Sequence, residues 1–209
     1  MEEQQRPVAV YLGVTGGMAV VFNLVGLLPF VRFRKRTLHG SPSALPLFAI
    51  LLIDLFIAAV QIFPTVTAAS GRWLYSEAGC TAYAAVELYL SGAQISMVTF
   101  IALDRYLITC APTWESWRSV VNYQKTLFFF GSVGALWCTL PMIGWGSYVP
   151  SPSRVACTID WSRTDHAYVS FLTGTFLLLF LVPFCSAAAL YYSTYEFVKR
   201  ANSAEARDE

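Results

Sequence analysis

An acid, a base and a phenol interrupt an apolar segment in "FIALDRYLITC", residues 100–110. Asp104 and Arg105 are neighbours, so the arginine can form an ion pair with the aspartate, and Tyr106 adds a hydroxyl beside them. An arginine tied to its neighbouring aspartate can hold a closed state, because opposite charges attract strongly where water is scarce. Release of the pair frees a cation to meet a partner protein. The triplet therefore has the chemistry of a switch.

A second group of polar residues recurs at helical spacing just before this triplet. Tyr83, Glu87, Ser91 and Gln94 are separated by four, four and three positions, which places them on one face of a helix. A charged side chain inside a lipid-spanning helix costs roughly 2.5 to 3.5 kcal/mol and usually faces a cavity or a partner. Glu87 is therefore either a functional charge or a protonated carboxyl that is hydrogen-bonded inside a bundle, with its pKa raised by desolvation.

Composition indicates which elements position these residues. The chain has 209 residues, of which 56% are hydrophobic and only 13% charged, against roughly 25% charged in a typical soluble domain. Five charge-poor stretches each meet the roughly 20 residues that a bilayer-spanning helix needs. A lipid-exposed segment must satisfy its own backbone, and no alternating strand pattern occurs in these stretches, so helix is the economical prediction.

We therefore predict an all-α membrane protein that forms a single membrane domain over residues 1–209. We expect a polar tail at 199–209, preceded by five transmembrane helices at about 8–32, 43–70, 80–108, 124–147 and 166–198. We expect a multi-pass protein in contact with the lipid bilayer. The net charge of +1 gives no indication of nucleic-acid binding.

The distribution of basic residues predicts the orientation. With the N-terminus outside, ten of the 14 Lys and Arg residues fall in inner loops and the tail, which obeys the positive-inside rule. Acidic residues precede the first helix and the basic cluster follows it, so we expect that it is not a cleavable signal sequence. We also expect the inner loop "APTWESWRSVVNYQK" to form a short amphipathic helix that presents Trp114 and Trp117 to the membrane interface.

The five cysteines differ in their expected depth. Cys80 opens the third helix and Cys157 lies in the loop between the fourth and fifth, so both face the oxidising side and can pair. A bridge that closes so long a loop would stabilise the fold by roughly 2 to 4 kcal/mol. No His, Cys or carboxylate cluster has metal-ligand spacing, so we predict neither a metal site nor an enzyme.

In their order and spacing, several of these residues together resemble the rhodopsin-like (class A) G-protein-coupled receptors. The matching pieces are Asn23, "LLIDLF" with Asp54, Trp73 in "GRWLYSEAGC", Cys80, "LDRY", Cys157, and "VPFCSAAALY" with Pro183 and Tyr191. The resemblance implies five helices of a seven-helix receptor bundle and a heterotrimeric G protein as partner. It also implies the residue roles: Asp104, Arg105 and Tyr106 as the G-protein switch, Pro183 and Tyr191 as the switch of the fifth helix, and Asn23, Asp54 and Gln94 as an interior polar network.

The second outer loop narrows the resemblance to the opsins, and within them to the peropsin and retinal-isomerase branch, through "GWGSY" and "CTIDW". Residues 155–161 alternate with the period of a strand, and the resemblance implies a β-hairpin at 148–165 over a chamber for retinal. In opsins the counterion lies at the position of Tyr83 or of Ser151, neither of which is acidic here. Glu87, one turn deeper, would be the substitute, and Ser91 continues the same stripe into the chromophore pocket.

The resemblance stops after the fifth helix. The family's sixth and seventh helices, with the retinal-linking lysine, have no counterpart, so we expect a chain truncated after the fifth helix. The only lysines are Lys35, Lys125 and Lys199, each at a helix end. A protonated imine to retinal needs an amine deep in the bundle, so we expect no covalent attachment site and no pigment formation by these residues alone.

Two functions remain open. One is an opsin-like receptor in truncated form, at the plasma membrane by resemblance. The other is a non-signalling five-helix interaction protein that associates with a full-length receptor. Without two further helices the polar stripe around Glu87 would face lipid, so retention in the endoplasmic reticulum is a further expectation. Gly131 stands where the family generally has a tryptophan, which leaves the packing of the second helix against the fourth open.

Overall fold

The computed structural model describes residues 2–38 and 40–208. Within this part of the chain, five helical segments are long and apolar enough to cross a membrane, which confirms the predicted helical membrane fold. They are α1 (Glu2–Arg32), α3 with α4 (Ala44–Val60 and Ile62–Ser70), α5 (Glu77–Cys110), α6 (Val120–Thr139), and α7 continuing into α8 (His166–Thr175 and Val182–Asp208).

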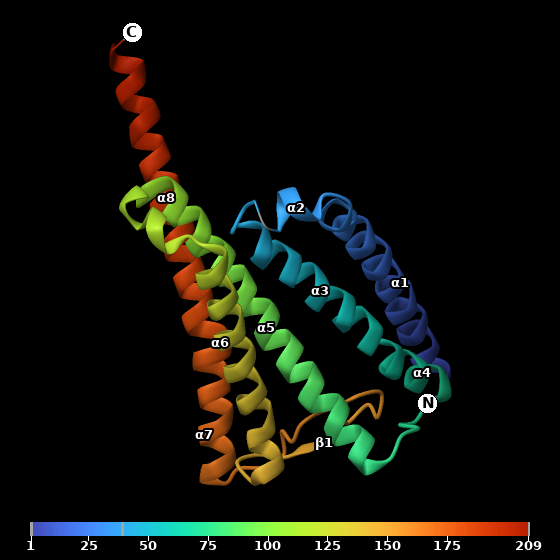
Figure 1. The fold of residues 1–209 in the computed structure, drawn as a ribbon. Coiled ribbons are helices and arrows are strands. Elements are labelled where there is room, and N and C mark those ends of the chain that lie inside the picture. Colours follow the sequence, from blue (N-terminus) through green and yellow to red (C-terminus); the bar gives the residue numbers. More distant parts are fainter. Residues whose placement is uncertain (1, 39, 209) are drawn as a thin grey trace.

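The helix α5 is the centre of the bundle. It contacts α3 on one side and α6 and α8 on the other, while α1 packs on α3 and α4. Figure 1 shows α1 and α3 on one side of α5, and α6 and α7 on the other. The short helix α2 (Arg34–Thr37) and the C-terminal end of α8 lie at the end of the bundle opposite the hairpin. The polar residues spaced along α5, from Tyr83 to Gln94, therefore lie between α3 on one side and α6 and α8 on the other.

Prolines interrupt two of the spans. The second span breaks at Gln61, between α3 and α4, three residues before Pro64, whose missing N–H leaves the carbonyl of Val60 without its helical donor. The fifth span widens into a π-helix over Phe176–Leu181 just before Pro183. There the Val182 N–H bonds to the Leu177 carbonyl, five residues back.

Several helix ends differ from those predicted, and two C-terminal ends differ most. The fourth helix stops at Thr139 rather than at residue 147, because a 3₁₀ turn (Leu140–Ile143) with Pro141 follows and Gly144 has a φ of +103°. The fifth runs through most of the predicted tail, where Glu196 pairs with Lys199 and Arg200 at helical spacing. Residues 1 and 209, the ends of the predicted domain, lie outside the described residues.

The predicted hairpin is present in a short form. Strands β1 (Tyr148–Pro150) and β2 (Cys157–Ile159) pair antiparallel, with Tyr148 opposite Ile159 and Pro150 opposite Cys157. The alternating stretch 155–161 is therefore only partly strand. The Cys80–Cys157 disulfide joins β2 to the first turns of α5, with 5.4 Å between the two Cα atoms. The hairpin is thus anchored across the end of the bundle (Figure 1).

Candidate functional site

Asp104 carries a buried charge at the end of α5. Its side chain is 1% exposed, and a carboxylate at such depth is stable only with polar partners. The hydroxyls of Ser43 and Tyr123 both donate hydrogen bonds to its Oδ1, the first at 2.9 Å. Arg105 Nη2 lies 3.5 Å from Oδ2, and Arg118 Nε lies 3.7 Å from Oδ1. We call Ser43, Asp104, Arg105, Arg118 and Tyr123 the Asp104 cluster.

The cluster joins four segments of the chain. Ser43 directly precedes α3, Arg118 follows the 3₁₀ turn Pro112–Trp117, and Tyr123 belongs to the first turn of α6. The ring of Tyr123 is fully buried and is held by two aromatic neighbours, with centroid distances of 4.9 Å to Phe100 and 5.6 Å to Trp117. The Asp104 carboxylate of α5 therefore binds side chains from the start of α3, from α6 and from the loop between α5 and α6.

Within the cluster, the adjacent Asp104 and Arg105 do lie within ion-pair distance. Arg105 is 45% exposed, whereas Arg118 is 20% exposed and also donates to Ser43 Oγ at 3.2 Å. Arg105 is thus the more exposed of the two cations at this carboxylate. Tyr106 faces elsewhere: it lines a hollow of about 400 Å³ between α5 and α8, together with Tyr192 and Glu196.

The predicted interior network is divided in the structure. The Gln94 amide donates to Asp54 Oδ1 at 2.7 Å, which links α5 to α3. The amide of Asn23 instead donates to the Ala19 carbonyl of its own helix at 2.9 Å. The polar contact between the first two spans is made by Gln61, which sequence reasoning missed. Its amide donates to the Leu12 carbonyl and to Thr15 Oγ1, at 3.1 and 3.0 Å.

The polar stripe of α5 borders two separate cavities. Tyr83 and Glu87 interact with each other and line a cavity of about 1180 Å³ between α1, α4 and the hairpin. Ser91 lines a second cavity, of about 590 Å³, between α5, β2 and the π-helix. The hairpin contributes Thr158 to the first cavity and Ile159 to the second. Although these residues lie on one face of α5, Glu87 and Ser91 therefore line different cavities.

The second cavity is almost entirely apolar. Its walls are mainly Leu88, Ile95, Ile159, Trp161, Leu172, Phe176, Leu179 and Phe180. A volume of several hundred Å³ with such a lining suits a small apolar ligand. Along the fifth span, the rings of Phe176, Phe180 and Phe184 follow one another at centroid distances of 5.6 and 5.9 Å. Among the described residues that line the two cavities, none is a lysine.

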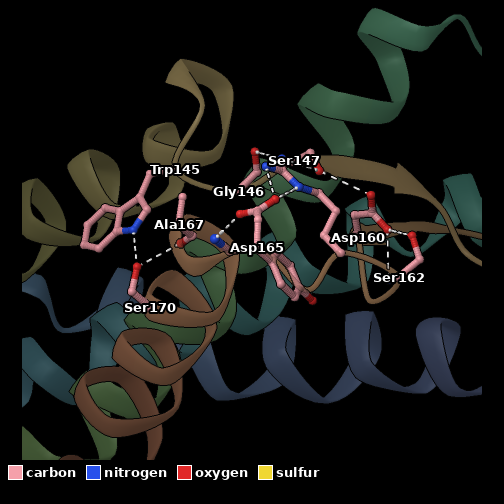
Figure 2. Close-up of polar contacts among 10 residues, drawn as sticks. Trp145, Gly146, Ser147, Asp160, Ser162, Asp165, Ala167 and Ser170 are labelled. Carbon is pink, nitrogen blue, oxygen red and sulfur yellow. Dashed lines mark hydrogen bonds and ion pairs between the residues drawn. The ribbon is translucent and has the colours of Figure 1, made fainter.

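Acidic residues fix the loop that leads from the hairpin into α7 (Figure 2). Asp165 accepts from the Tyr168 N–H at 2.8 Å and from Arg163 Nε at 2.7 Å. These two contacts hold the pKa of Asp165 below its usual range. Asp160 accepts from the hydroxyl and the N–H of Ser162, which lowers its pKa too.

The same loop is tied to the start of the hairpin. Arg163 Nη1 donates to the Gly146 carbonyl at 3.2 Å, and the Trp145 indole donates to Ser170 Oγ of α7 at 2.8 Å. Figure 2 shows Trp145 and Ser170 on one side of Asp165, and Asp160 with Ser162 on the other. The rim of the apolar cavity is therefore held by charged and polar contacts from several directions.

The glycine at position 131 has a neighbour from α5 rather than an empty space. A Cβ at Gly131 would lie 3.5 Å from the hydroxyl of Tyr89, and one at Gly134 would lie 3.3 Å from the Tyr89 ring. The tryptophan of this helix, Trp137, donates its indole N–H to Thr175 Oγ1 at 3.0 Å and so links α6 to α7. The indole of Trp137 is therefore directed toward the fifth span, whereas Tyr123 of the same helix packs on Phe100 of α5.

Comparisons with known proteins agree with this geometry. The family described as 7 transmembrane receptor (rhodopsin family) matches residues 25–209. Human visual pigment-like receptor peropsin is 27% identical over 193 residues, which cover 91% of this chain and 56% of that protein. Retinochrome of Todarodes pacificus is 28% identical over 172 residues, which cover 80% of this chain and 55% of that protein. The chain thus spans about half the length of the curated relatives it matches.

The fold has a counterpart among solved structures. The crystal structure of squid rhodopsin superimposes with a TM-score of 0.86 at 18% identity, covering all of this chain and 60% of that one. At this identity the likeness concerns the fold alone. The curated relatives also include the RPE-retinal G protein-coupled receptor of Bos taurus, 29% identical over 159 residues, which cover 76% of this chain and 54% of that protein. Both it and peropsin are named as receptors, which supports the prediction of a receptor rather than an enzyme. The chain belongs to the rhodopsin family of seven-transmembrane receptors, and within it is similar to the opsins near peropsin.

Proposed function

We propose that this chain forms the five-helix part of an opsin-type light receptor. In this proposal retinal occupies the apolar cavity beneath the hairpin, and a heterotrimeric G protein binds at the end that carries the Asp104 cluster. The observation that carries the proposal is the cavity of about 590 Å³, whose apolar walls come from α5, β2 and the fifth span. An apolar polyene gains from burial in proportion to the area that leaves water.

Retinal attachment requires more than the residues present here. Lys35 belongs to the short helix α2, Lys125 to the second turn of α6 and Lys199 to the C-terminal half of α8, and none of them lines either cavity. Covalent pigment therefore needs a lysine on helices supplied by further sequence or by a second chain. Glu87 would serve as the counterion of that protonated imine, because it lies in the neighbouring cavity one turn below Tyr83. The alternative for Glu87 is a protonated carboxyl covered by the same added helices.

The signalling end follows from the charge distribution. Because ten of the 14 basic residues belong to the loops and tail at this end, it faces the cytoplasm and the N-terminus lies outside. Arg105 is released from Asp104 and contacts the G protein, while Tyr106, Pro183 and Tyr191 move with the α5–α8 contact. In the complete receptor the Gln94–Asp54 bond and Asn23 would belong to one network that links this end to the cavities, whereas here the Asn23 amide bonds within its own helix.

A second function is favoured by one particular surface. Glu87 and Ser91 are exposed in the bundle, as are Phe176, Phe180 and Phe184 along the fifth span. A charge that faces lipid costs roughly 2.5 to 3.5 kcal/mol, so this surface requires covering helices. A full-length receptor could supply them, in which case the chain acts as a non-signalling interaction protein. It would then accumulate in the endoplasmic reticulum when expressed alone, rather than at the plasma membrane.

The two functions are distinguished by complementation. The chain is expressed alone and together with a fragment of human peropsin that carries the rest of that receptor's bundle, and 11-cis-retinal is added. We expect visible absorbance that survives acid trapping only in the complemented sample, and a lower imine pKa with Glu87→Gln. Complex formation without any pigment supports the interaction protein. Covalent pigment formed by the chain alone contradicts both functions.

A further inference from the structure

A run of basic residues lies where the first span ends. Arg32 is the last residue of α1, and Arg34 and Lys35 belong to the four-residue helix α2 that follows. All three side chains are exposed. We call residues 32–35 the α1–α2 basic turn. It lies at the end of the bundle opposite the hairpin (Figure 1).

These charges lack the acidic partners that Arg105, Arg118, Lys199 and Arg200 have at the same end. In the sequence no Asp or Glu occurs between Glu3 and Asp54, and the carboxylate of Asp54 is bound to Gln94 inside the bundle. Among the described residues, no ion pair involves Arg32, Arg34 or Lys35. The ion pairs found at this end are those of Asp104 with Arg105 and Arg118, and of Glu196 with Lys199 and Arg200.

The backbone holds the turn in place beside apolar side chains. The Phe33 N–H donates to the Pro29 carbonyl at 3.0 Å, and the Thr37 N–H donates to the Phe33 carbonyl at 2.9 Å. Phe33 is 54% exposed and Val31 is 72% exposed. Because the turn directly follows a 28-residue span, its cations and these two apolar side chains lie together at the level of the lipid headgroups.

We propose that the α1–α2 basic turn binds the headgroups of acidic phospholipids. The guanidinium groups of Arg32 and Arg34 offer paired N–H donors that match phosphate oxygens, and Lys35 adds a point charge. Phe33 anchors the turn among the upper acyl carbons. In the orientation proposed above, this leaflet is the cytoplasmic one, whose surface is anionic. The lipid site itself depends neither on retinal nor on a G protein.

The test uses the full chain in nanodiscs that contain phosphatidylserine and phosphatidylcholine in equal amounts. The lipids retained on the released chain are counted by native mass spectrometry. Each basic residue near an anionic surface contributes a factor of about five at low salt, so Arg34→Gln with Lys35→Gln should lower the serine-lipid preference by at least about fivefold. Arg34→Lys with Lys35→Arg should keep it, which separates charge from folding.

A matched control removes the same number of charges from a compensated site. Lys199→Gln with Arg200→Gln should leave the lipid preference of the chain within about twofold of the unsubstituted protein, because Glu196 already neutralises part of their charge. An equal loss in this control would overturn the proposal, since the preference would then come from net charge alone. Equal retention of both lipids would overturn it as well. Loss of the preference on adding inorganic phosphate at constant ionic strength would assign the site to free phosphate instead.

Discussion

Replacing Tyr123 by phenylalanine removes one hydroxyl from the Asp104 cluster and leaves the aromatic packing in place. That hydroxyl donates to Oδ1 of a carboxylate whose side chain is 1% exposed, so water cannot take over the hydrogen bond. A hydrogen bond to a charged group is worth roughly 1.5 to 3 kcal/mol. Ser43 still donates to the same oxygen at 2.9 Å, so we expect the variant to lose about 2 kcal/mol.

The loss is measured as the change in apparent Tm of the purified chain in mild detergent. For a chain of this size about 1 kcal/mol corresponds to roughly 2 to 4 °C, which gives a decrease of about 4 to 8 °C. Tyr192→Phe is the matched control, because the Tyr192 side chain is 66% exposed and its change should stay within about 0.5 kcal/mol. A double-mutant cycle with Asp104→Asn isolates the pairwise coupling. Equal effects of the two tyrosine variants, or a coupling near zero, would refute the reasoning.

Three further outcomes are expected. Cys80→Ser should lower the unfolding free energy by about 2 to 4 kcal/mol, whereas Cys185→Ser, at an exposed free cysteine, should change the apparent Tm little. Gly174→Ala should lower the apparent Tm, because the new Cβ would lie 3.1 Å from the Trp137 ring. That ring cannot move away easily, since it stacks on Phe171 and its indole N–H is bonded to Thr175. The lowered pKa of Asp165 means that its stabilisation is complete at neutral pH and is lost as pH falls through that pKa. Asp165→Asn should therefore flatten the dependence of Tm on pH below about pH 4.

Features that depend on local sequence could be predicted. The five spans follow from runs of apolar residues, and the Asp104–Arg105 pair follows from adjacency in the chain. The Cys80–Cys157 bridge followed from the side of the membrane that each cysteine was expected to face, once the spans were known. For the spans and the ion pair the signal lies within one segment, and for the bridge it lies in the two segments that carry the cysteines.

The partners of Asp104 could not be predicted in this way. Ser43 lies 61 residues from Asp104 and Tyr123 lies 19 residues from it, and neither stands in a motif that suggests the contact. Their approach depends on how α3 and α6 cross α5, which single-sequence periodicity does not encode. The same reason explains the α5 stripe. Its spacing placed Glu87 and Ser91 on one face, but the hairpin and the fifth span divide that face between two cavities.

Topology mapping of the full chain in cells gives a direct measurement of the proposed arrangement. A glycosylation acceptor is placed before α1 in one variant, in residues 151–155 between β1 and β2 in a second, and after residue 208 in a third. We expect glycosylation at the first two sites and none at the third, because five spans place the N-terminus and the hairpin outside and the C-terminus in the cytosol. Glycosylation of both termini, or of the C-terminus alone, would contradict the five-span arrangement with its N-terminus outside.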